Sequence, residues 1–171
     1  MIDLHTHTTY SDGTDDVITL LKNAEKSRLE VLSITDHVTC KAYEELKHID
    51  IKQYYTGKII KGCELYSTIE GQTIELLAYN MNTDIFNELL PTMYCSETKD
   101  NKWQAKKLLQ ICKDIGIYID YDNLHINYET QFCGLVSGGS DYHADNKSGT
   151  KLGIGKGNLN IPIEILDDWN I

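Results

Sequence analysis

The sequence predicts one α/β domain over residues 1–171, in which short apolar strands alternate with amphipathic helices. Apolar runs at residues 31–34 and 58–62 have the length of buried strands, and residues 15–28 repeat apolar side chains at helical spacing. A histidine, an aspartate or a glutamate follows each of these strand-like runs. Polar residues gathered at the carboxyl ends of strands are the general arrangement of α/β barrels.

Two strands and two helices are expected to alternate in the first part of the chain. Acidic residues at Asp15 and Asp16 are expected in the first turn of the first helix, where they suit the helix dipole. The apolar face of this helix contains Val17, Leu20, Leu21 and Ala24. In chain order, the expected elements are strand, helix, strand and helix at residues 1–4, 15–28, 31–34 and 42–49.

The rest of the chain is expected to add further strands and one long helix. The turn at Glu70 and Gly71 joins two strand-like segments and predicts a hairpin. Gly116 marks the expected end of the long helix. The expected elements are strands at residues 58–62, 65–69, 73–79 and 132–136, and a helix at residues 99–115.

Length and composition fit one globular domain with a substantial core, because the chain has 171 residues of which 41% are hydrophobic. No apolar run is long enough to cross a bilayer, and because the first motif begins at residue 3, no removable leader is expected. The five cysteines are odd in number and show no CxxC spacing, which favours reduced thiols. A cytoplasmic protein that does not associate with membranes is therefore expected.

The formal net charge is −10, and this excess of acidic residues argues against a protein that binds nucleic acid through its overall electrostatic potential. Stable binding of long nucleic acid is therefore not expected. Arg28 is the only arginine, so a bidentate guanidinium clamp on phosphate is almost excluded. Cationic contacts to a phosphorylated substrate are expected from lysines or from bound metals. The sequence does not specify an oligomeric state.

His5 and His7 lie two residues apart after an apolar start, so their side chains share one face of the expected first strand. Both imidazoles can therefore reach one metal ion. Asp12 follows in a Ser-Asp-Gly loop, from which a carboxylate can turn back to the same place. An isolated His-x-His pair could arise by chance, but similar polar blocks follow later apolar runs at residues 35–37 and 139–143. The pattern favours a metal-dependent hydrolase.

Four blocks of this sequence resemble the PHP (polymerase and histidinol phosphatase) family, and they occur in the family's order. The blocks are Asp3-Leu4-His5-Thr6-His7 with Ser11-Asp12-Gly13, Ile34-Thr35-Asp36-His37, Gly62-Cys63-Glu64-Leu65, and Gly139-Ser140-Asp141-Tyr142-His143. Small stand-alone members of this family are metal-dependent phosphoesterases. The resemblance therefore implies a metal-dependent phosphoric ester hydrolase of the PHP type.

The resemblance also implies a distorted (β/α)7 barrel. This chain has little room between Ile119 and Phe132 for strands that family members insert there. Those strands usually carry further histidines, including one followed by proline, whereas neither Pro91 nor Pro162 follows a histidine here. A trimmed or open version of the PHP-type barrel is therefore expected.

The resemblance assigns seven metal ligands to the four blocks: His5, His7, Asp12, His37, Glu64, Asp141 and His143. Among them, Glu64 matches the family's bridging glutamate. One expected ion is shared by His5, His7, Glu64 and Asp141, and the other three residues are expected to serve a second ion. Imidazole and carboxylate without thiolate suit two or three divalent ions of zinc, manganese or iron, and do not discriminate between these metals.

An intermediate ion is expected to be absent, weakly bound or held by substitutes, because its usual histidines are missing. Glu75 stands where many relatives carry a histidine ligand, and it could bind the cation or be a solvent-facing strand residue. His125 is a second possible substitute, whereas His48 is expected at the surface of a helix. Asp36 has two possible roles, since it could orient a ligating imidazole or cap a loop.

The expected mechanism needs no protein nucleophile. Two divalent ions that share Glu64 can hold a bridging hydroxide, which attacks phosphorus while the ions bind the phosphoryl oxygens. His37 or His143 could protonate the leaving alcohol if it is not fully committed to metal. One lysine after the last block could contact phosphate, or each could be a solvated surface residue: Lys147, Lys151 and Lys156.

Two functions of different class are compatible with the sequence. The first is an active phosphoesterase on a small phosphorylated metabolite or nucleotide. The second is a metal-binding module with weak or no catalysis and a structural or regulatory role. The missing histidines and the scarcity of arginine favour the second function. Hydrolysis of an aryl phosphate with manganese, compared with an Asp141→Ala variant, separates the two.

Overall fold

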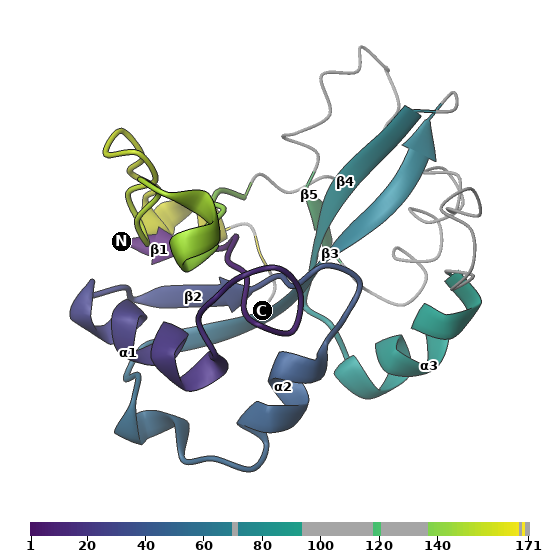
Figure 1. Cartoon of the computed structure of the whole chain (residues 1–171), viewed down its shortest axis with the longest axis horizontal. Coiled ribbons are helices and arrows are strands. Elements are labelled where there is room, and N and C mark those ends of the chain that lie inside the picture. Colours follow the sequence, from purple (N-terminus) through teal and green to yellow (C-terminus); the bar gives the residue numbers. More distant parts are fainter. Residues whose placement is uncertain (70–71, 94–117, 121–136, 168, 170–171) are drawn as a thin grey trace.

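The computed structural model describes residues 1–69, 72–93, 118–120, 137–167 and 169 of the chain. They form an α/β fold around a curled sheet with the strand order β1-β2-β3-β4-β5 (Figure 1). The strands are β1 (Ile2–Asp3), β2 (Val31–Ile34), β3 (Lys58–Ile69), β4 (Gln72–Tyr79) and β5 (Tyr118–Asp120). Within the described part the sheet is open, because no pairing joins β5 to β1. The predicted α/β class is confirmed, whereas the trimmed or open form of a PHP-type (β/α)7 barrel stays a prediction.

β3 is a long strand that belongs to two parts of the sheet in succession. Its first residues pair in parallel with β2, as far as Lys61 opposite Ile34. From Gly62 onward it pairs antiparallel with β4, and this hairpin projects away from the parallel strands (Figure 1). The hairpin predicted within residues 65–79 is confirmed. Glu64 lies inside this continuous strand, however, and not just beyond a strand that ends near residue 62.

The first two helices lie where they were predicted, with shorter bounds. α1 (Val17–Lys26) begins after Asp16, whose carboxylate accepts a hydrogen bond from the backbone N–H of Thr19 at 2.7 Å. Asp16 therefore caps the helix, and the first turn itself contains no acidic residue, which corrects the expectation. α2 (Lys41–Leu46) ends earlier than expected and is followed by a 3-10 turn at Ile51–Gln53.

Two elements were not expected from the sequence, namely α3 (Thr83–Met93) and the short strand β5. Phe86 on α3 is buried in the same apolar cluster as the inner faces of α1 and α2. After residue 137 the chain runs mainly through turns, with the 3-10 helices η2 (Ala144–Lys147) and η3 (Ile163–Leu166).

Several predictions lie outside the described residues. They are the helix at residues 99–115, the strand at residues 132–136 and the candidate ligand His125. Among the helices that the structure describes, none combines the length and the apolar character needed to span a membrane.

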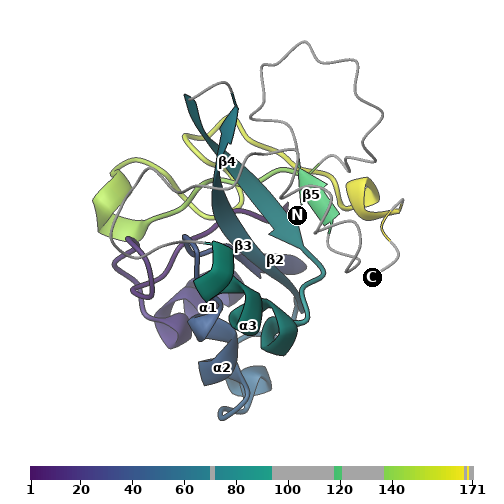
Figure 2. The same cartoon turned by 90° about the vertical axis from the view of Figure 1, so that its right-hand side faces the viewer.

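Both faces of the parallel strands are covered, by different parts of the chain. Successive strand residues point to opposite faces, so Val31 and Leu32 on β2 enter different apolar clusters. Helices α1, α2 and α3 lie on one side of the sheet, and the C-terminal segment with η3 lies on the other (Figure 2). On that second side, Trp169 packs against Tyr79 of β4, with ring centroids 5.0 Å apart.

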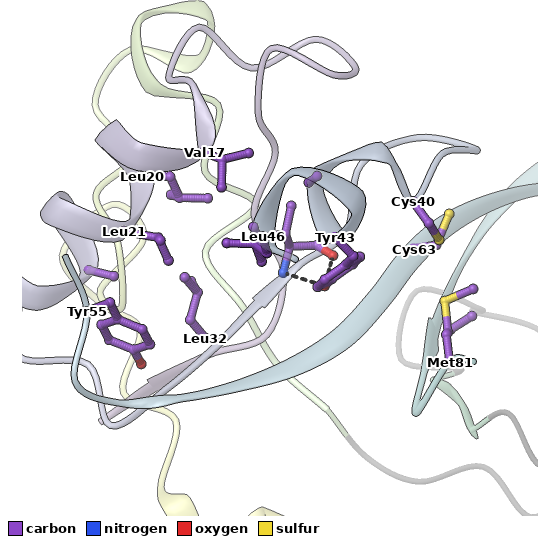
Figure 3. Close-up of a cluster of buried hydrophobic side chains, with 14 of the residues drawn as sticks. Val17, Leu20, Leu21, Leu32, Cys40, Tyr43, Leu46, Tyr55, Cys63 and Met81 are labelled. Carbon is purple, nitrogen blue, oxygen red and sulfur yellow. Dashed lines mark hydrogen bonds between the residues drawn. The ribbon is translucent and has the colours of Figure 1, made fainter. Parts of the chain in front are cut away.

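Tyr43 of α2 ties the two central strands together from the helical side, among the buried side chains drawn in Figure 3. Its hydroxyl oxygen accepts hydrogen bonds from the backbone N–H of Ile34 at 3.1 Å and of Gly62 at 2.8 Å. Burial raises the pKa of this hydroxyl, so it stays protonated and donates to the carbonyl of Ile34. Tyr43 thereby fixes the register where β2 ends and β3 continues toward Glu64.

Candidate metal centre

His5 and His7 lie just after β1 with their imidazole rings on the same side, 5.1 Å apart between centroids. Thr6 lies between them, forms a parallel bridge with Tyr142 and donates a side-chain hydrogen bond to the carbonyl of Ser33 at 2.8 Å. The pattern follows from strand geometry, in which neighbouring side chains alternate between faces. The predicted common direction of the two imidazoles is therefore found, although β1 itself ends before them.

β2 and β3 bring His37 and Glu64 to the same place. His37 follows the end of β2 and forms a parallel bridge with Glu64. The backbone N–H of Val38 donates to the carbonyl of Glu64 at 2.9 Å, and the N–H of Glu64 donates to the carbonyl of Thr35 at 3.2 Å. These bonds hold the backbone of Glu64, whose side chain is 3% exposed and faces the histidines.

The segment from Gly139 to His143 supplies the remaining side chains. Gly139 packs so tightly against the first segment that a Cβ atom there would lie 2.3 Å from the Cβ of His5. Asp141 has a φ of 55°, a left-handed conformation that aspartate tolerates better than most residues. Nδ1 of His143 lies 2.9 Å from the carbonyl oxygen of Asp141, which orients the ring.

A first group of four side chains converges on one point. The Nε2 atoms of His5 and His7 each lie 3.1 Å from Oε2 of Glu64. Oδ1 of Asp141 lies 3.4 Å from Nε2 of His5 and 3.5 Å from Nε2 of His7. Ligand atoms of His5, His7 and Glu64 all lie within 4.8 Å of one another, a spacing at which nitrogen and carboxylate oxygen atoms can bind one divalent ion. Asp141 adjoins this set through its contacts with the two histidines.

A second group forms around Asp12. One oxygen of this carboxylate lies 3.2 Å from Nε2 of His143, and the other lies 3.6 Å from Nε2 of His37. The ring of His7 stacks on His143 with centroids 4.1 Å apart, and its Nδ1 lies 3.5 Å from Asp12. His7 therefore has one ring nitrogen toward each group, whereas the sequence placed it in the first group alone.

A third group consists of His37, Glu64 and Glu75, whose possible ligand atoms lie within 4.8 Å of one another. Glu75 is exposed on β4 and stands opposite Tyr66 of β3 in the hairpin register. The structure therefore places Glu75 beside the other candidate ligands, where the sequence left it open. His48, by contrast, is exposed, as expected.

The electrostatics of the first group favour the forms that bind cations. Burial raises the pKa of the Glu64 carboxyl, but contacts with His5 and His7 outweigh burial and hold this pKa well below its usual range. Burial lowers the pKa of His7, and the neighbouring His5 and His143 act in the same direction, against the effect of Glu64. An ionised carboxylate beside a neutral imidazole is the state required for metal binding.

Two buried imidazole nitrogens support the same assignment. Nε2 of His7 and Nδ1 of His37 make no hydrogen bond of acceptable geometry among the described residues, although Glu64 lies 3.1 and 3.5 Å away. Buried polar atoms normally have partners. Nitrogen atoms that face carboxylate oxygens without a hydrogen bond suit a cation bound between them, so the donor set fits a divalent metal.

Asp36 anchors a loop of the centre. Its carboxylate accepts hydrogen bonds from the backbone N–H and the hydroxyl of Thr8 and from the hydroxyl of Ser11, each at 2.7 Å. The same Ser11 oxygen lies 3.4 Å from Nδ1 of His7. Of the two roles considered for Asp36, these contacts support the loop cap, and the residue approaches a histidine only through Ser11.

Asp3 and Tyr66 are further residues of the centre that were not assigned a role from the sequence. Asp3 is fully buried and accepts hydrogen bonds from the backbone N–H groups of Ser140 at 2.8 Å and Gly153 at 2.7 Å. Tyr66 stacks on His37 with ring centroids 5.0 Å apart and 13° between the planes. Asp3 could have been suspected from its place in the first block, whereas no sequence signal indicates Tyr66.

The cationic side chains are unequally placed around the centre. Lys147 of η2 forms an ion pair with Oδ2 of Asp141. Lys151 and Lys156 are exposed, and neither forms an ion pair with the seven candidate ligands. Arg28 lines an open pocket together with Lys58, the first residue of β3. This pocket lies at the amino ends of the parallel strands, whereas the candidate ligands follow their carboxyl ends.

A sequence profile of the PHP domain family matches residues 3–144, which include every side chain of the three groups described above. The chain belongs to the PHP domain family. An uncharacterised protein of Methanocaldococcus jannaschii is 30% identical to it over 152 residues, and the match covers 79% of this chain and 85% of that protein.

A second curated protein and a solved structure also resemble this chain. The 5′-3′ exoribonuclease Rnm of Escherichia coli is 28% identical over 108 residues, which cover 63% of this chain but only 36% of Rnm. A crystal structure from Bifidobacterium adolescentis, described as a candidate metal-dependent phosphoesterase, superimposes with a TM-score of 0.67. The superposition covers 88% of this chain and 91% of the Bifidobacterium chain. At 14% identity it establishes the fold alone.

PHP membership and the grouped histidines and carboxylates together support a metal-dependent hydrolase. They also suggest divalent metals, without specifying which metal or how many ions.

Proposed function

We propose that this PHP protein is a metal-dependent phosphoesterase that acts on a small phosphate ester. The observation that carries the proposal is the convergence of side chains from distant segments on one centre: His5, His7, Asp12, His37, Glu64, Asp141 and His143. Their donor atoms are imidazole nitrogens and carboxylate oxygens only. Such donors bind zinc, manganese or iron.

The proposal assigns the candidate ligands to two ions. His5, His7, Glu64 and Asp141 would hold one ion, and Asp12, His37 and His143 would hold the other. A third ion between Glu64, His37 and Glu75 is the remaining option for the intermediate position. When bound, divalent ions supply an acidified water and positive charge for the phosphoryl oxygens.

Side chains of the centre also have roles besides binding metal, namely holding neighbouring ligands in place and transferring a proton. Glu64 lies between His5 and His7 and keeps the ligand groups at short separation. His37 and His143 are more exposed than the fully buried His7, with side-chain exposures of 17% and 11%. In this proposal, one of these two protonates the leaving oxygen, which requires a ring nitrogen that is not bound to metal.

The proposed substrate is a small phosphomonoester or phosphodiester, such as a phosphorylated metabolite or a nucleotide. The partial likeness to Rnm adds short RNA ends to the candidates. The net charge of −10 argues against stable binding of long nucleic acid. We expect the protein to act in the cytoplasm, in keeping with its unpaired buried cysteines Cys40 and Cys63.

The test uses protein stripped with a chelator and reloaded with Mn²⁺. We expect hydrolysis of p-nitrophenyl phosphate, of bis(p-nitrophenyl) phosphate or of both, and its loss in His7→Ala and Asp141→Ala. His48→Ala is the matched control, because His48 is exposed and belongs to none of the three groups. Full activity in the stripped protein or in His7→Ala would disprove the mechanism. A panel of phosphorylated metabolites and a short 5′-phosphorylated RNA would then identify the substrate.

The second candidate is a metal-binding PHP module with weak or no catalysis and a structural or regulatory role. The observation that favours it is the position of Arg28 away from the centre, which leaves no guanidinium for a phosphate. Tight Mn²⁺ binding by wild-type protein that hydrolyses none of these substrates would support this function over the first.

A further inference from the structure

Lys147 is the cationic side chain that the fold brings to the candidate metal centre. Its ammonium group contacts Oδ2 of Asp141, and among the described residues no other lysine or arginine forms an ion pair with any of the seven candidate ligands. η2 begins directly after His143, and Lys147 is its last residue. The chain therefore places a positive charge at the rim of a centre made otherwise of histidines and carboxylates.

The position of Lys147 is fixed by more than its own side chain. η2 is attached to the loop that carries Asp12 by a hydrogen bond from the Asn146 side chain to the Asp12 carbonyl. A second bond runs from the backbone N–H of Asp145 to the hydroxyl of Thr14 at 2.9 Å. The backbone beside Lys147 is thus held against a ligand-bearing loop, which limits where the ammonium group can lie.

Asp141 has different neighbours at its two carboxylate oxygens. Oδ1 lies 3.4 Å from His5 and 3.5 Å from His7, on the side of the proposed ion, whereas Oδ2 faces Lys147. The ammonium group is therefore separated from the proposed ion by one carboxylate. It has three N–H donors, of which Asp141 occupies one. The Lys147 side chain is 43% exposed, so its remaining donors can reach a ligand that approaches from solvent.

We propose that Lys147 binds a phosphate oxygen of the substrate and is positioned for this by Asp141. The proposal rests on the proposed phosphoesterase function. Lysine binds phosphate as a point charge, and a phosphate bound at the ions would lie beside the Asp141 carboxylate and therefore beside the ammonium group. This assignment replaces the open choice among three lysines, because Lys151 and Lys156 have no such contact.

A different role for Lys147 would give different measurements. If the lysine only competed with metal for Asp141, its removal would strengthen Mn²⁺ binding and leave phosphate binding unchanged. If it only supported the fold of the Asp141 loop, its removal would weaken Mn²⁺ binding. A phosphate-binding lysine affects phosphate affinity while the ions remain bound.

The experiment measures binding of inorganic phosphate to the Mn²⁺-loaded protein by calorimetry, with Mn²⁺ affinity determined separately. In Lys147→Met we expect the phosphate Kd to rise roughly tenfold, as for loss of one charge-assisted hydrogen bond at a half-exposed site. Lys147→Arg should keep most of the affinity, because the charge is retained. Lys151→Met is the matched control and should bind phosphate like wild type. Mn²⁺ affinity should be similar in all four proteins.

Turnover of p-nitrophenyl phosphate gives a second readout. Lys147→Met should raise KM by a similar factor and leave kcat largely unchanged, the pattern of a contact that is equally strong in ground and transition states. The proposal is overturned if Lys147→Met binds phosphate like wild type, if it loses Mn²⁺, or if loaded wild-type protein binds no phosphate. Phosphate binding that depends on Lys147 without any turnover would instead refute only the phosphoesterase function.

Discussion

Asp3 is a fully buried carboxyl directly before the first histidines, and it holds a distant part of the chain. It accepts hydrogen bonds from Ser140, Gly153 and His5. Burial raises the pKa of Asp3, although these hydrogen bonds act in the opposite direction. The acid of the first block therefore positions the Asp141 segment beside His5 and contacts none of the other candidate ligands in the described structure.

The Asp3→Asn substitution tests this positioning role. An amide turns an N–H donor toward backbone donors, so we expect the free energy of unfolding to fall by about 1–3 kcal/mol. Mn²⁺ affinity should fall as well, because Asp141 is no longer held beside the histidines. Urea unfolding and a Mn²⁺ titration measure the two effects. The control is Asp50→Asn at an exposed position, and an equal response of both variants would contradict the role of Asp3.

At the residue scale, the blocks around His5, His37 and His143 could be read from the sequence because each one is local. A short apolar run followed by histidine and aspartate contains both the strand and the residues that the strand presents. The link from Asp3 to Ser140 and Gly153 could not be read in this way, because it joins segments about 140 residues apart and depends on the assembled sheet. Every residue except proline has a backbone N–H group, so the residue type does not indicate which acceptor that group will bind.

At the scale of elements, the N-terminus of α1 depends on Asp16. Its side chain accepts the backbone N–H of Thr19, one of the donors that a helix leaves without an intrahelical partner. Hydrogen bonds from Thr19 lower the pKa of Asp16. α1 contributes four buried residues to the core on the helical side of the sheet, so its stability bears on the whole parallel part: Val17, Leu20, Leu21 and Ala24.

We expect Asp16→Ala to lower the free energy of unfolding by about 1 kcal/mol at neutral pH, the usual effect of losing an N-cap. The pKa of Asp16 is lower in the folded protein than its ordinary value of 3.8. Above pH 3.8 the charged cap therefore makes its full contribution to the free energy of unfolding. This contribution is lost as the pH falls through the folded-state pKa of Asp16. Asp16→Asn, which caps without titrating, is the control. Urea unfolding at several pH values should show that wild type loses stability relative to Asp16→Asn only in acid, and a difference that is constant with pH would contradict the prediction.

Elements differ in how well the sequence predicted them. The parallel strands and α1 were predicted because each has a clear apolar period and a boundary signal. Glu64 was placed near a strand end because Gly62 interrupts the apolar run. β3 nevertheless continues past Gly62, because it pairs with β4 from the point where its pairing with β2 ends. α3 was not expected because its sequence contains Thr83, Asn87 and Pro91, which carry little helical signal, and its packing through Phe86 is a tertiary effect.

At the scale of the whole molecule, the candidate metal centre concentrates negative charge in a protein whose net charge is −10. Asp12, Glu64 and Asp141 converge from three segments, and their mutual repulsion opposes the folded state when no cation is bound. Bound divalent ions would connect the loops after β1 and β2 with the segment before η2. Metal binding is therefore expected to affect the stability of the entire parallel half, beyond the loops that carry the ligands.

Thermal unfolding with and without metal measures how much bound ions stabilise the fold. A ligand that binds only the folded state stabilises it by RT ln(1 + [L]/Kd), which is about 2.7 kcal/mol when the free ion is at one hundred times its Kd. Removal of metal with a chelator should therefore lower Tm, and added Mn²⁺ should restore it. His7→Ala should show almost no response to Mn²⁺, since His7 adjoins both proposed ions, whereas exposed His48→Ala should respond like wild type. Equal Mn²⁺ responses in the two variants would place the bound ions elsewhere, because of these two histidines His7 alone has its ring nitrogens near the clustered carboxylates.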